Sequence, residues 1–310
     1  MRVLVLGGTG WVGHHIASQL LEAGHTVVIG CRGKTQRFAP PATAQRVLVD
    51  KGNPDTFRAA QVGDVEVVID TVPTPDSVHN VFEAFAGRIR HYIHCSSTGV
   101  YVPLQRVPAT EEHPWRESTG ENFMQKVQVD ALALELHVRH GFPVTVLRPS
   151  NIVGPGMIPL DIWGARRAGY WRRLHRSLPV VVPGDGATLL QPCHVKDVAK
   201  AFVLASGQPQ SVGGVFNISA AYSITLDQYV DASKKVLGSA SPVTHMPTAD
   251  LCRAHPDAEG MLDKDGLRFL CQHMCFDISR ARTELGYIPA FTPEQGIQDS
   301  IAWMFRTNLL

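Results

Sequence analysis

The chain has 310 residues, of which 44% are hydrophobic and 18% charged, and its formal net charge is +1. This composition is that of a folded chain and excludes a strong overall attraction to nucleic acid or to a membrane surface. Six cysteines lack the paired spacing of a zinc site, so we expect reduced thiols and no metal. We also expect a cytoplasmic protein, because the first residues enter a strand directly and no apolar run reaches membrane-spanning length.

The first motif is the glycine-rich run Gly-Gly-Thr-Gly-Trp-Val-Gly at residues 7–13. Four apolar residues before it indicate a buried strand, and apolar residues at helical spacing follow it. In this setting Gly7 permits a tight turn, Gly10 lets backbone N–H groups approach a pyrophosphate, and Gly13 lets the helix pack closely. The helix N-terminus adds donors, so the run predicts a dinucleotide site. The residues expected to hold the cofactor are Gly7, Thr9, Gly10, Trp11, Val12 and Gly13.

Strand and helix patterns alternate through the first half of the chain. Further strands are expected at His25–Gly30, Arg46–Val49, Val65–Asp70, His91–Cys95 and Val144–Leu147. Helices are expected at Asp76–Gly87 and Glu121–His140. This alternation predicts an α/β fold, a doubly wound parallel sheet of the Rossmann type, with its site at the carboxyl ends of the strands.

After Arg148 the pattern is less regular. A loop rich in glycine and proline precedes the basic, aromatic segment Arg166–Arg176, and Pro242–Gln272 reads as polar and irregular. The other expected elements are helices at His194–Ser206 and Pro293–Phe305, a short helix ending at 285–287, and a strand at Val215–Ile218. We expect a Rossmann domain at 1–155, to which 194–218 returns, and a smaller substrate-binding lobe made of 156–193 and 219–310.

Several motifs resemble those of the extended short-chain dehydrogenases/reductases, the NAD-dependent epimerase/dehydratase group. They are the glycine run at 7–13, Ser-Ser-Thr-Gly-Val-Tyr at 96–101, Leu-Arg-Pro-Ser-Asn at 147–151, Gly-Asp-Gly at 184–186, His-Val-Lys-Asp-Val-Ala at 194–199 and Ala-Arg-Thr-Glu-Leu-Gly-Tyr at 281–287. Together they span nearly the whole chain. The runs at 32–34, 94–101 and 194–197 are most similar to the branch that contains chloroplast stem-loop-binding proteins.

In this family a Ser or Thr, a Tyr, and a Lys four residues after the Tyr carry the chemistry, so the resemblance assigns Ser97 and Lys126 to catalysis. The tyrosine position holds Asn122, whose amide cannot donate a proton as a phenol does. Either another group supplies the proton, or the reaction needs none, or the protein binds cofactor without turnover. The nearby alternatives as proton donor are Tyr101, Glu121 and His94. Each of the three also has a purely structural explanation. Tyr101 could be a core aromatic residue, Glu121 a carboxylate that stabilises the first turn of a helix, and His94 a buried histidine.

Cations follow the second strand at the place where NAD enzymes carry an acidic residue for the adenosine ribose. Arg32 and Lys34 stand there and can pair with a 2′-phosphate, which a carboxylate would repel. We therefore predict NADP as the cofactor, with NAD as the alternative if both are ordinary loop cations. By resemblance, Asp50 contacts the adenine and Lys126 holds the nicotinamide ribose.

The resemblance implies substrate contacts from Ser97, Arg148 and Asn151. Relatives that bind nucleotide sugars often carry an arginine a few residues after Gly-Asp-Gly, and here that position is Leu190. We predict an NAD(P)-dependent oxidoreductase or epimerase-like enzyme acting on a hydroxyl or carbonyl of a small molecule, such as a sugar or sugar-nucleotide derivative. The alternative is a catalytically weak cofactor-binding protein with an RNA-associated role, because the residue types of Arg166–Arg176 suit phosphates and bases. The net charge argues against a broad nucleic-acid surface.

A homodimer is also expected. The helices at Asp76–Gly87 and Glu121–His140 carry more apolar residues than one core-facing stripe needs, and helices at these places often form the dimer contact in the family. The alternative is that all of these side chains face the sheet.

Overall fold

A computed structural model describes residues 1–34, 37–60, 62–116, 121–254 and 263–310, and the side chains of 121–123 lie outside that description. The predictions for the Asn122 and Glu121 side chains therefore fall outside the described residues. Within the described ranges, no helix combines the length and the apolar character that crossing a membrane requires.

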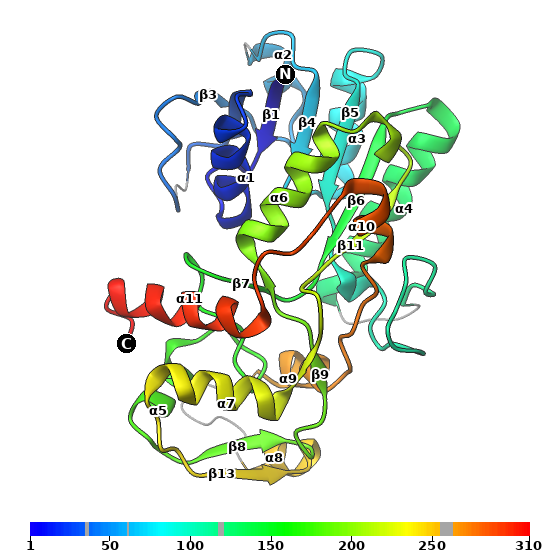
Figure 1. Cartoon of the computed structure of the whole chain (residues 1–310). Coiled ribbons are helices and arrows are strands. Elements are labelled where there is room, and N and C mark those ends of the chain that lie inside the picture. The colour runs from blue at the N-terminus through cyan, green and yellow to red at the C-terminus, as the bar shows by residue number, and fades with distance from the viewer. Residues whose placement is uncertain (35–36, 61, 117–120, 255–262) are drawn as a thin grey trace.

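The larger part of the molecule is built on a parallel sheet of seven strands, in the order β11-β6-β5-β4-β1-β2-β3 (Figure 1). The strands are β1 (Arg2–Leu6), β2 (Thr26–Cys31), β3 (Gln45–Leu48), β4 (Val67–Asp70), β5 (His91–Cys95), β6 (Val144–Pro149) and β11 (Val215–Ile218). In register, Leu4 of β1 lies between Val28 of β2 and Val68 of β4. The strand order reverses at β1 and β4, which confirms the doubly wound fold and opens a crevice at the carboxyl ends there.

Helices cover both faces of this sheet. One layer contains α1 (Trp11–Glu22), α6 (Val195–Ser206) and α10 (Ser279–Leu285), and the other contains α2 (Pro54–Ala59), α3 (Pro75–Phe85) and α4 (Glu121–His140). Because successive side chains of a strand point to opposite faces, Val3 and Val5 pack under the first layer and Leu4 under the second. The near-continuous apolar strands of the sequence are therefore buried on both sides.

A smaller lobe lies beyond the carboxyl ends of the strands (Figure 1). Its helices are α5 (Ala168–His175), α7 (Leu226–Leu237), α8 (Thr248–Ala254), α9 (Lys264–Leu270) and α11 (Pro293–Arg306). Short strand pairs complete this region and join it to the sheet: β7 (Ile152–Val153) with β10 (Cys193–His194), β8 (Val180–Pro183) with β13 (Val243–Met246), and β9 (Leu189–Leu190) with β12 (Ile224–Thr225). Two 3₁₀ turns are η1 (Thr98–Val100) and η2 (Pro209–Ser211). α10 packs on α6 and β11 of the larger part, although its residues fall in the range expected for the lobe.

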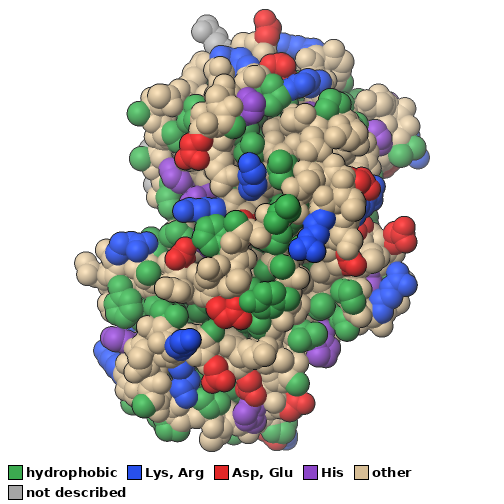
Figure 2. Space-filling model, in the orientation of Figure 1, with side chains coloured by type: hydrophobic (Ala, Val, Ile, Leu, Met, Phe, Trp, Pro, Cys, Tyr) green, Lys and Arg blue, Asp and Glu red, His purple; other side chains and the backbone are tan. Residues whose placement is uncertain are grey.

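Two sequence readings of the second half differ from the structure. The segment Pro242–Gln272, read as irregular, contains β13, α8 and α9, which are too short to show a clear period in the sequence. The aromatic residues of the basic segment are not exposed. Tyr170 and Trp171 are fully buried in the lobe core, so they offer no stacking surface for nucleic acid. On the face viewed in Figure 2, acidic and basic side chains are interspersed.

Candidate active site

The glycine-rich turn has the shape that the sequence predicts. Gly7 has φ +81°, and a Cβ added there would lie 2.4 Å from Thr71 Oγ1. A Cβ added at Gly13 would lie 2.3 Å from the Gly7 carbonyl oxygen, so the helix can approach the strand only with glycine there. Gly10 is the N-cap of α1 and no side chain caps the helix, which leaves first-turn N–H groups for a ligand. The residues present therefore fit the pyrophosphate of a dinucleotide.

Trp11, the first residue of α1, connects this turn to the smaller lobe. Its indole Nε1 donates a hydrogen bond of 2.7 Å to the Pro155 carbonyl oxygen. A Cβ added at Gly156, which has φ +103°, would lie 2.9 Å from Trp11 Cδ1. The guanidinium carbon of Arg166 lies 5.8 Å from the centre of the Trp11 ring, within cation–π range. The loop after β7 and the glycine turn are thus packed as one unit.

Cations gather at the end of β2, as predicted. Arg32 and Lys34 are exposed in the loop that follows the strand. Arg46 of β3 lies close by, because its Nε donates to Cys31 Sγ at 3.2 Å. The sequence analysis missed Arg46, since its place beside Cys31 depends on the pairing of β2 with β3.

The end of β3 carries Asp50, whose Oδ1 accepts a hydrogen bond of 3.1 Å from the Gly52 N–H. The next residue, Lys51, forms a 2.7 Å ion pair with the buried Asp70 at the end of β4. Burial lowers the pKa of Lys51, and the neighbouring Asp70 opposes that change. Sequence reasoning missed this pair, whose members meet only because β3 and β4 end at the same edge of the sheet.

Ser97 and the Lys126 amine both lie at the carboxyl end of β5. Ser97 caps η1, and its Oγ accepts a 3.1 Å hydrogen bond from the Gly99 N–H. The Lys126 Nζ, from the first turns of α4, donates to the Cys95 carbonyl oxygen at 3.0 Å. The amine thus lies against the backbone carbonyl two residues before Ser97, and Lys126 is not among the residues that line the cavity described below.

Behind these residues lies a buried polar network centred on Asp130. Its Oδ1 lies 2.7 Å from His94 Nε2, and its Oδ2 accepts from Ser96 Oγ at 2.8 Å and from Arg148 Nε at 2.9 Å. Arg148 also donates to the Tyr101 hydroxyl oxygen. Burial alone would raise the pKa of Asp130, but the hydrogen bond and charge of His94, then Arg148 and Ser96, hold it below its usual value.

Three of the predicted site residues have a structural role in this network. His94, Tyr101 and Arg148 are at most 1% exposed, and none of them lines the cavity described below. Burial raises the pKa of Tyr101 to about 12, even though Arg148 opposes the change. In this structure they tie β5, α4 and β6 together, where the sequence analysis had considered Tyr101 and His94 as proton donors and Arg148 as a substrate contact.

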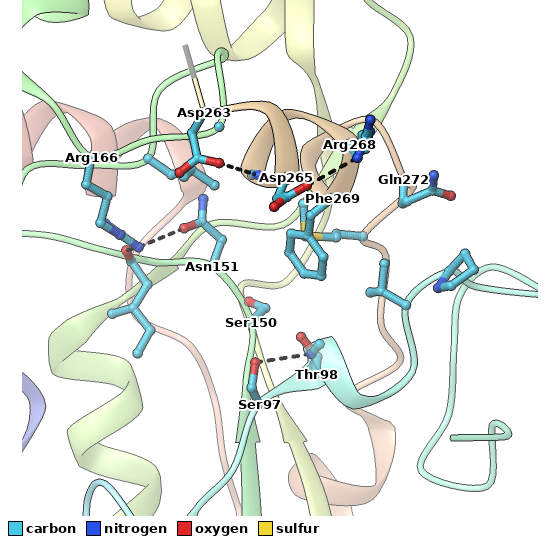
Figure 3. A pocket seen from close by; sticks show the side chains of 18 of the residues that line it. Ser97, Thr98, Ser150, Asn151, Arg166, Asp263, Asp265, Arg268, Phe269 and Gln272 are labelled. Atoms are coloured by element: carbon cyan, nitrogen blue, oxygen red, sulfur yellow. Dashed lines mark hydrogen bonds and ion pairs between the residues drawn. The ribbon is translucent and has the colours of Figure 1, made fainter. Parts of the chain in front are cut away.

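A cavity of about 920 Å³ lies between the carboxyl ends of the strands and the smaller lobe (Figure 3). Ser97 and Asn151, both predicted, line it from the larger part. The lobe contributes α9, which includes Arg268 and Phe269, and Arg166 from the segment before α5. The cavity therefore joins Ser97, at the end of β5, to Arg166 of the basic segment considered above for binding phosphates, and to α9, which no sequence prediction assigned to a site.

Comparisons with known proteins agree with this geometry. The chain is 27% identical over 316 residues to the chloroplast stem-loop binding protein of 41 kDa b from Arabidopsis thaliana, covering 96% of this chain and 78% of that protein. It is 25% identical over 344 residues to a dTDP-glucose 4,6-dehydratase from an Actinoplanes species, covering 99% and 98%. The structure of UDP-glucuronic acid 4-epimerase from Bacillus cereus, solved with UDP-glucuronic acid and NAD, superposes with a TM-score of 0.78 at 18% identity, covering 99% and 100%. That level of identity indicates a shared fold.

The model of the NAD dependent epimerase/dehydratase family matches residues 3–219, from β1 through the return strand β11. This range includes the glycine turn, Ser97, Lys126 and the strands that carry them, and it confirms the resemblance seen in the sequence motifs. The protein belongs to the NAD-dependent epimerase/dehydratase family.

Proposed function

We propose that the protein is an NAD(P)-dependent enzyme of epimerase, dehydratase or reductase type that acts on a hydroxyl or carbonyl group of a small molecule. The observation that supports the proposal is that Ser97 lines the cavity at the end of β5, where the Lys126 amine bonds the Cys95 carbonyl oxygen. The names of the relatives, which include a dTDP-glucose dehydratase and a UDP-glucuronic acid epimerase, support a sugar or sugar derivative as substrate.

In the proposed reaction, different residues of the chain bind the cofactor and the substrate oxygen. When bound, a nicotinamide cofactor supplies the hydride acceptor or donor. The glycine turn holds its pyrophosphate, and the Lys126 amine holds the nicotinamide ribose. Because Ser97 Oγ accepts from the Gly99 N–H, its own proton is free to donate to the substrate oxygen.

The proton-transfer role is the unusual part of the proposal. With Asn122 in place of tyrosine, the side chain offers hydrogen bonds but no titratable group. Alcohol oxidation should therefore be slow unless another acid replaces it, because a positioned acid or base typically contributes about 10²–10⁴-fold.

We expect Asn122→Tyr to create or raise generic dehydrogenase activity, measured as the absorbance change of the reduced nicotinamide with sugar and sugar-nucleotide substrates. Wild type assayed in parallel is the reference. If wild type already reduces a carbonyl quickly, Glu121→Gln tests that carboxylate as the proton donor, and Tyr101→Phe should leave the rate unchanged because Tyr101 is buried and does not line the cavity. Slow turnover by both wild type and Asn122→Tyr on every substrate of these classes would contradict the proposed function.

For the cofactor, we propose a preference for NADP. Arg32 and Lys34 are exposed and free of acidic partners among the described residues. NADPH should bind more tightly than NADH by roughly 1–3 kcal/mol if one charge-assisted pair forms with the 2′-phosphate. Calorimetry should show that Arg32→Ala removes most of this difference, whereas Arg139→Ala, on the far end of α4, leaves it intact. Equal affinities of wild type for the two cofactors would refute the preference.

We also propose a homodimer through α3 and α4. Val78, Val81 and Phe85 face the sheet, so they are not available for an interface. The outer surface still carries Val138, which is 81% exposed, and the half-buried Leu134. Light scattering at micromolar concentration should give the dimer mass, and Val138→Asp should shift it toward the monomer. A monomeric mass for wild type would rule the dimer out.

A further inference from the structure

Arg166 lies in the cavity wall without a counter-charge in direct contact. Its guanidinium donates to Asn151 Oδ1 at 3.1 Å, to the Ile152 carbonyl oxygen at 3.0 Å and to the Ile158 carbonyl oxygen at 2.9 Å. All three acceptors are neutral, and among the described residues no carboxylate lies within ion-pair distance of this guanidinium. A partly buried cation that is held by neutral groups alone is stabilised by an anion that enters its site.

The charged groups near Arg166 neutralise little of its positive charge. The Arg37 guanidinium repels it, and the Asp161 carboxylate attracts it. The nearby Tyr229 phenol carries no charge near neutral pH, because burial raises its pKa. The Asp161 carboxylate is turned to the backbone, since its Oδ1 accepts from the Trp163 N–H at 2.9 Å and the Ala165 N–H at 3.1 Å. Burial also raises the pKa of Asp161 to about 7, so this carboxyl is only partly ionised near neutral pH.

Asn151 adds a donor beside the guanidinium. The Asn151 Oδ1 accepts a hydrogen bond from Arg166, so the Nδ2 group of the same amide remains as a donor. This Nδ2 is buried and has no hydrogen-bond partner among the described residues. In Figure 3, Asn151 and Arg166 lie together on one side of the cavity, and Ser150 lies between them and Ser97. A guanidinium and an amide N–H₂ side by side are a donor set for an oxyanion.

We propose that Arg166 and Asn151 form an oxyanion subsite, which binds a carboxylate or phosphate group of the substrate while its reacting carbon faces Ser97. The inference deepens the proposed function and rests on it. The substrate would then be an anionic small molecule, such as a sugar acid or a sugar phosphate. Leu190 cannot supply an anion contact, because it is apolar and 1% exposed in β9, whereas Arg166 reaches the cavity from another segment.

The oxyanion has two conceivable sources, the substrate and the cofactor. The Arg166 guanidinium lies within cation–π range of Trp11 in the glycine turn, yet Arg166 also lines the cavity together with α9 and Ser97. The turn has its own N–H donors for the pyrophosphate, so we assign the subsite to the substrate. The experiment below includes an arm for the cofactor.

The test uses calorimetry on the full chain to measure the binding of four probes. Glucuronate and glucose 6-phosphate are compared with uncharged glucose, and inorganic phosphate is measured alone. Wild type should prefer the anionic sugars to glucose. Arg166→Gln should weaken the anionic probes by about 10–100-fold, the loss expected for a charge-assisted hydrogen bond, and leave glucose unchanged. The matched control is Arg268→Gln, because Arg268 lines the same cavity but is already paired with Asp265 at 3.2 Å.

A second variant keeps the test decisive if Arg166→Gln does not fold. Asn151→Asp places a carboxylate where the amide now accepts from Arg166, so the guanidinium gains an internal partner. This variant should keep or raise its melting temperature and lose binding of the anionic probes.

Three results would overturn the inference: equal binding of glucose and its anionic counterparts by wild type, undiminished anion binding by Asn151→Asp, or an equal loss in Arg268→Gln. NADPH affinity, measured on the same variants, separates the sources. A loss confined to NADPH would assign the oxyanion to the cofactor and refute a substrate site. Anion binding through Arg166 in a chain that binds neither NADH nor NADPH would instead refute the proposed function and leave the subsite standing.

Discussion

Replacing Lys126 by alanine is expected to lower cofactor-dependent turnover by about 10²–10⁴-fold, the usual contribution of a positioned group in acid–base catalysis. The 3.0 Å hydrogen bond from Lys126 Nζ to the Cys95 carbonyl oxygen fixes the amine at the end of β5. There it would hold the nicotinamide ribose whichever group moves the proton. The prediction therefore does not depend on what replaces the missing tyrosine.

The measurement is kcat together with the cofactor dissociation constant. Lys126→Arg is the matched variant, because it keeps the charge but changes the geometry of the donor, and it should retain part of the cofactor affinity. Thermal melting should differ little between the variants, since the amine bonds one backbone carbonyl and no buried charge. An unchanged rate in Lys126→Ala would show that the active site lies elsewhere.

Asp130→Ala is expected to destabilise the fold by about 3–5 kcal/mol, which is the cost of breaking a buried ion pair by removing one partner. Arg148 is fully buried, and its Nε bonds Asp130 at 2.9 Å. Without the carboxylate, the guanidinium charge, His94 and Ser96 would lose their shared acceptor. Urea unfolding should show the loss as a lower midpoint with a similar slope.

Two controls sharpen this measurement. Glu135→Ala removes an exposed carboxylate of the same helix, which pairs with Arg139 at 3.1 Å, and should change stability by less than about 1 kcal/mol. Asp130→Asn keeps the size of the side chain and removes the charge. Because the folded-state pKa of Asp130 is lowered, its charge stabilises the fold near neutral pH, and this advantage over asparagine should shrink as the pH falls through that pKa. A destabilisation of Asp130→Ala no larger than that of Glu135→Ala would contradict the role assigned to the network.

The sequence predicts elements well where the pattern is long or the strand is buried on both faces. The helix expected at Glu121–His140 and the strands at His91–Cys95 and Val215–Ile218 have those bounds in the structure. The helix carries a helical period and ends before Gly141, Gly214 precedes the strand at Val215–Ile218, and the strand His91–Cys95 is buried along its whole length. The glycine turn and the cations after β2 were also predictable, because their chemistry depends on residues adjacent in the chain.

The interior of the site was less predictable, because its contacts join distant segments. In the sequence Arg166 is one of several cations in a basic segment. In the structure it alone of this segment lines the cavity, whereas Arg172 and Arg173 donate to the carbonyl oxygens of Leu309 and Pro179. Similarly, nothing local to Arg148 indicates that its partner is Asp130 on α4. Such assignments need the packing of strands and helices that no periodicity supplies.

The contact between Trp11 and the loop after β7 constrains how this lineage can vary. The indole and the Phe38 ring together fill the space that a side chain at position 156 would need, and the indole N–H is bonded to the Pro155 carbonyl oxygen. A homologous chain can therefore acquire a side chain at position 156 only if both aromatic residues change and the loop leaves its positive-φ conformation. Positions 11, 38 and 156 should therefore vary together, and a chimera that exchanges only the first 30 residues between such homologues should disrupt the packing of this loop.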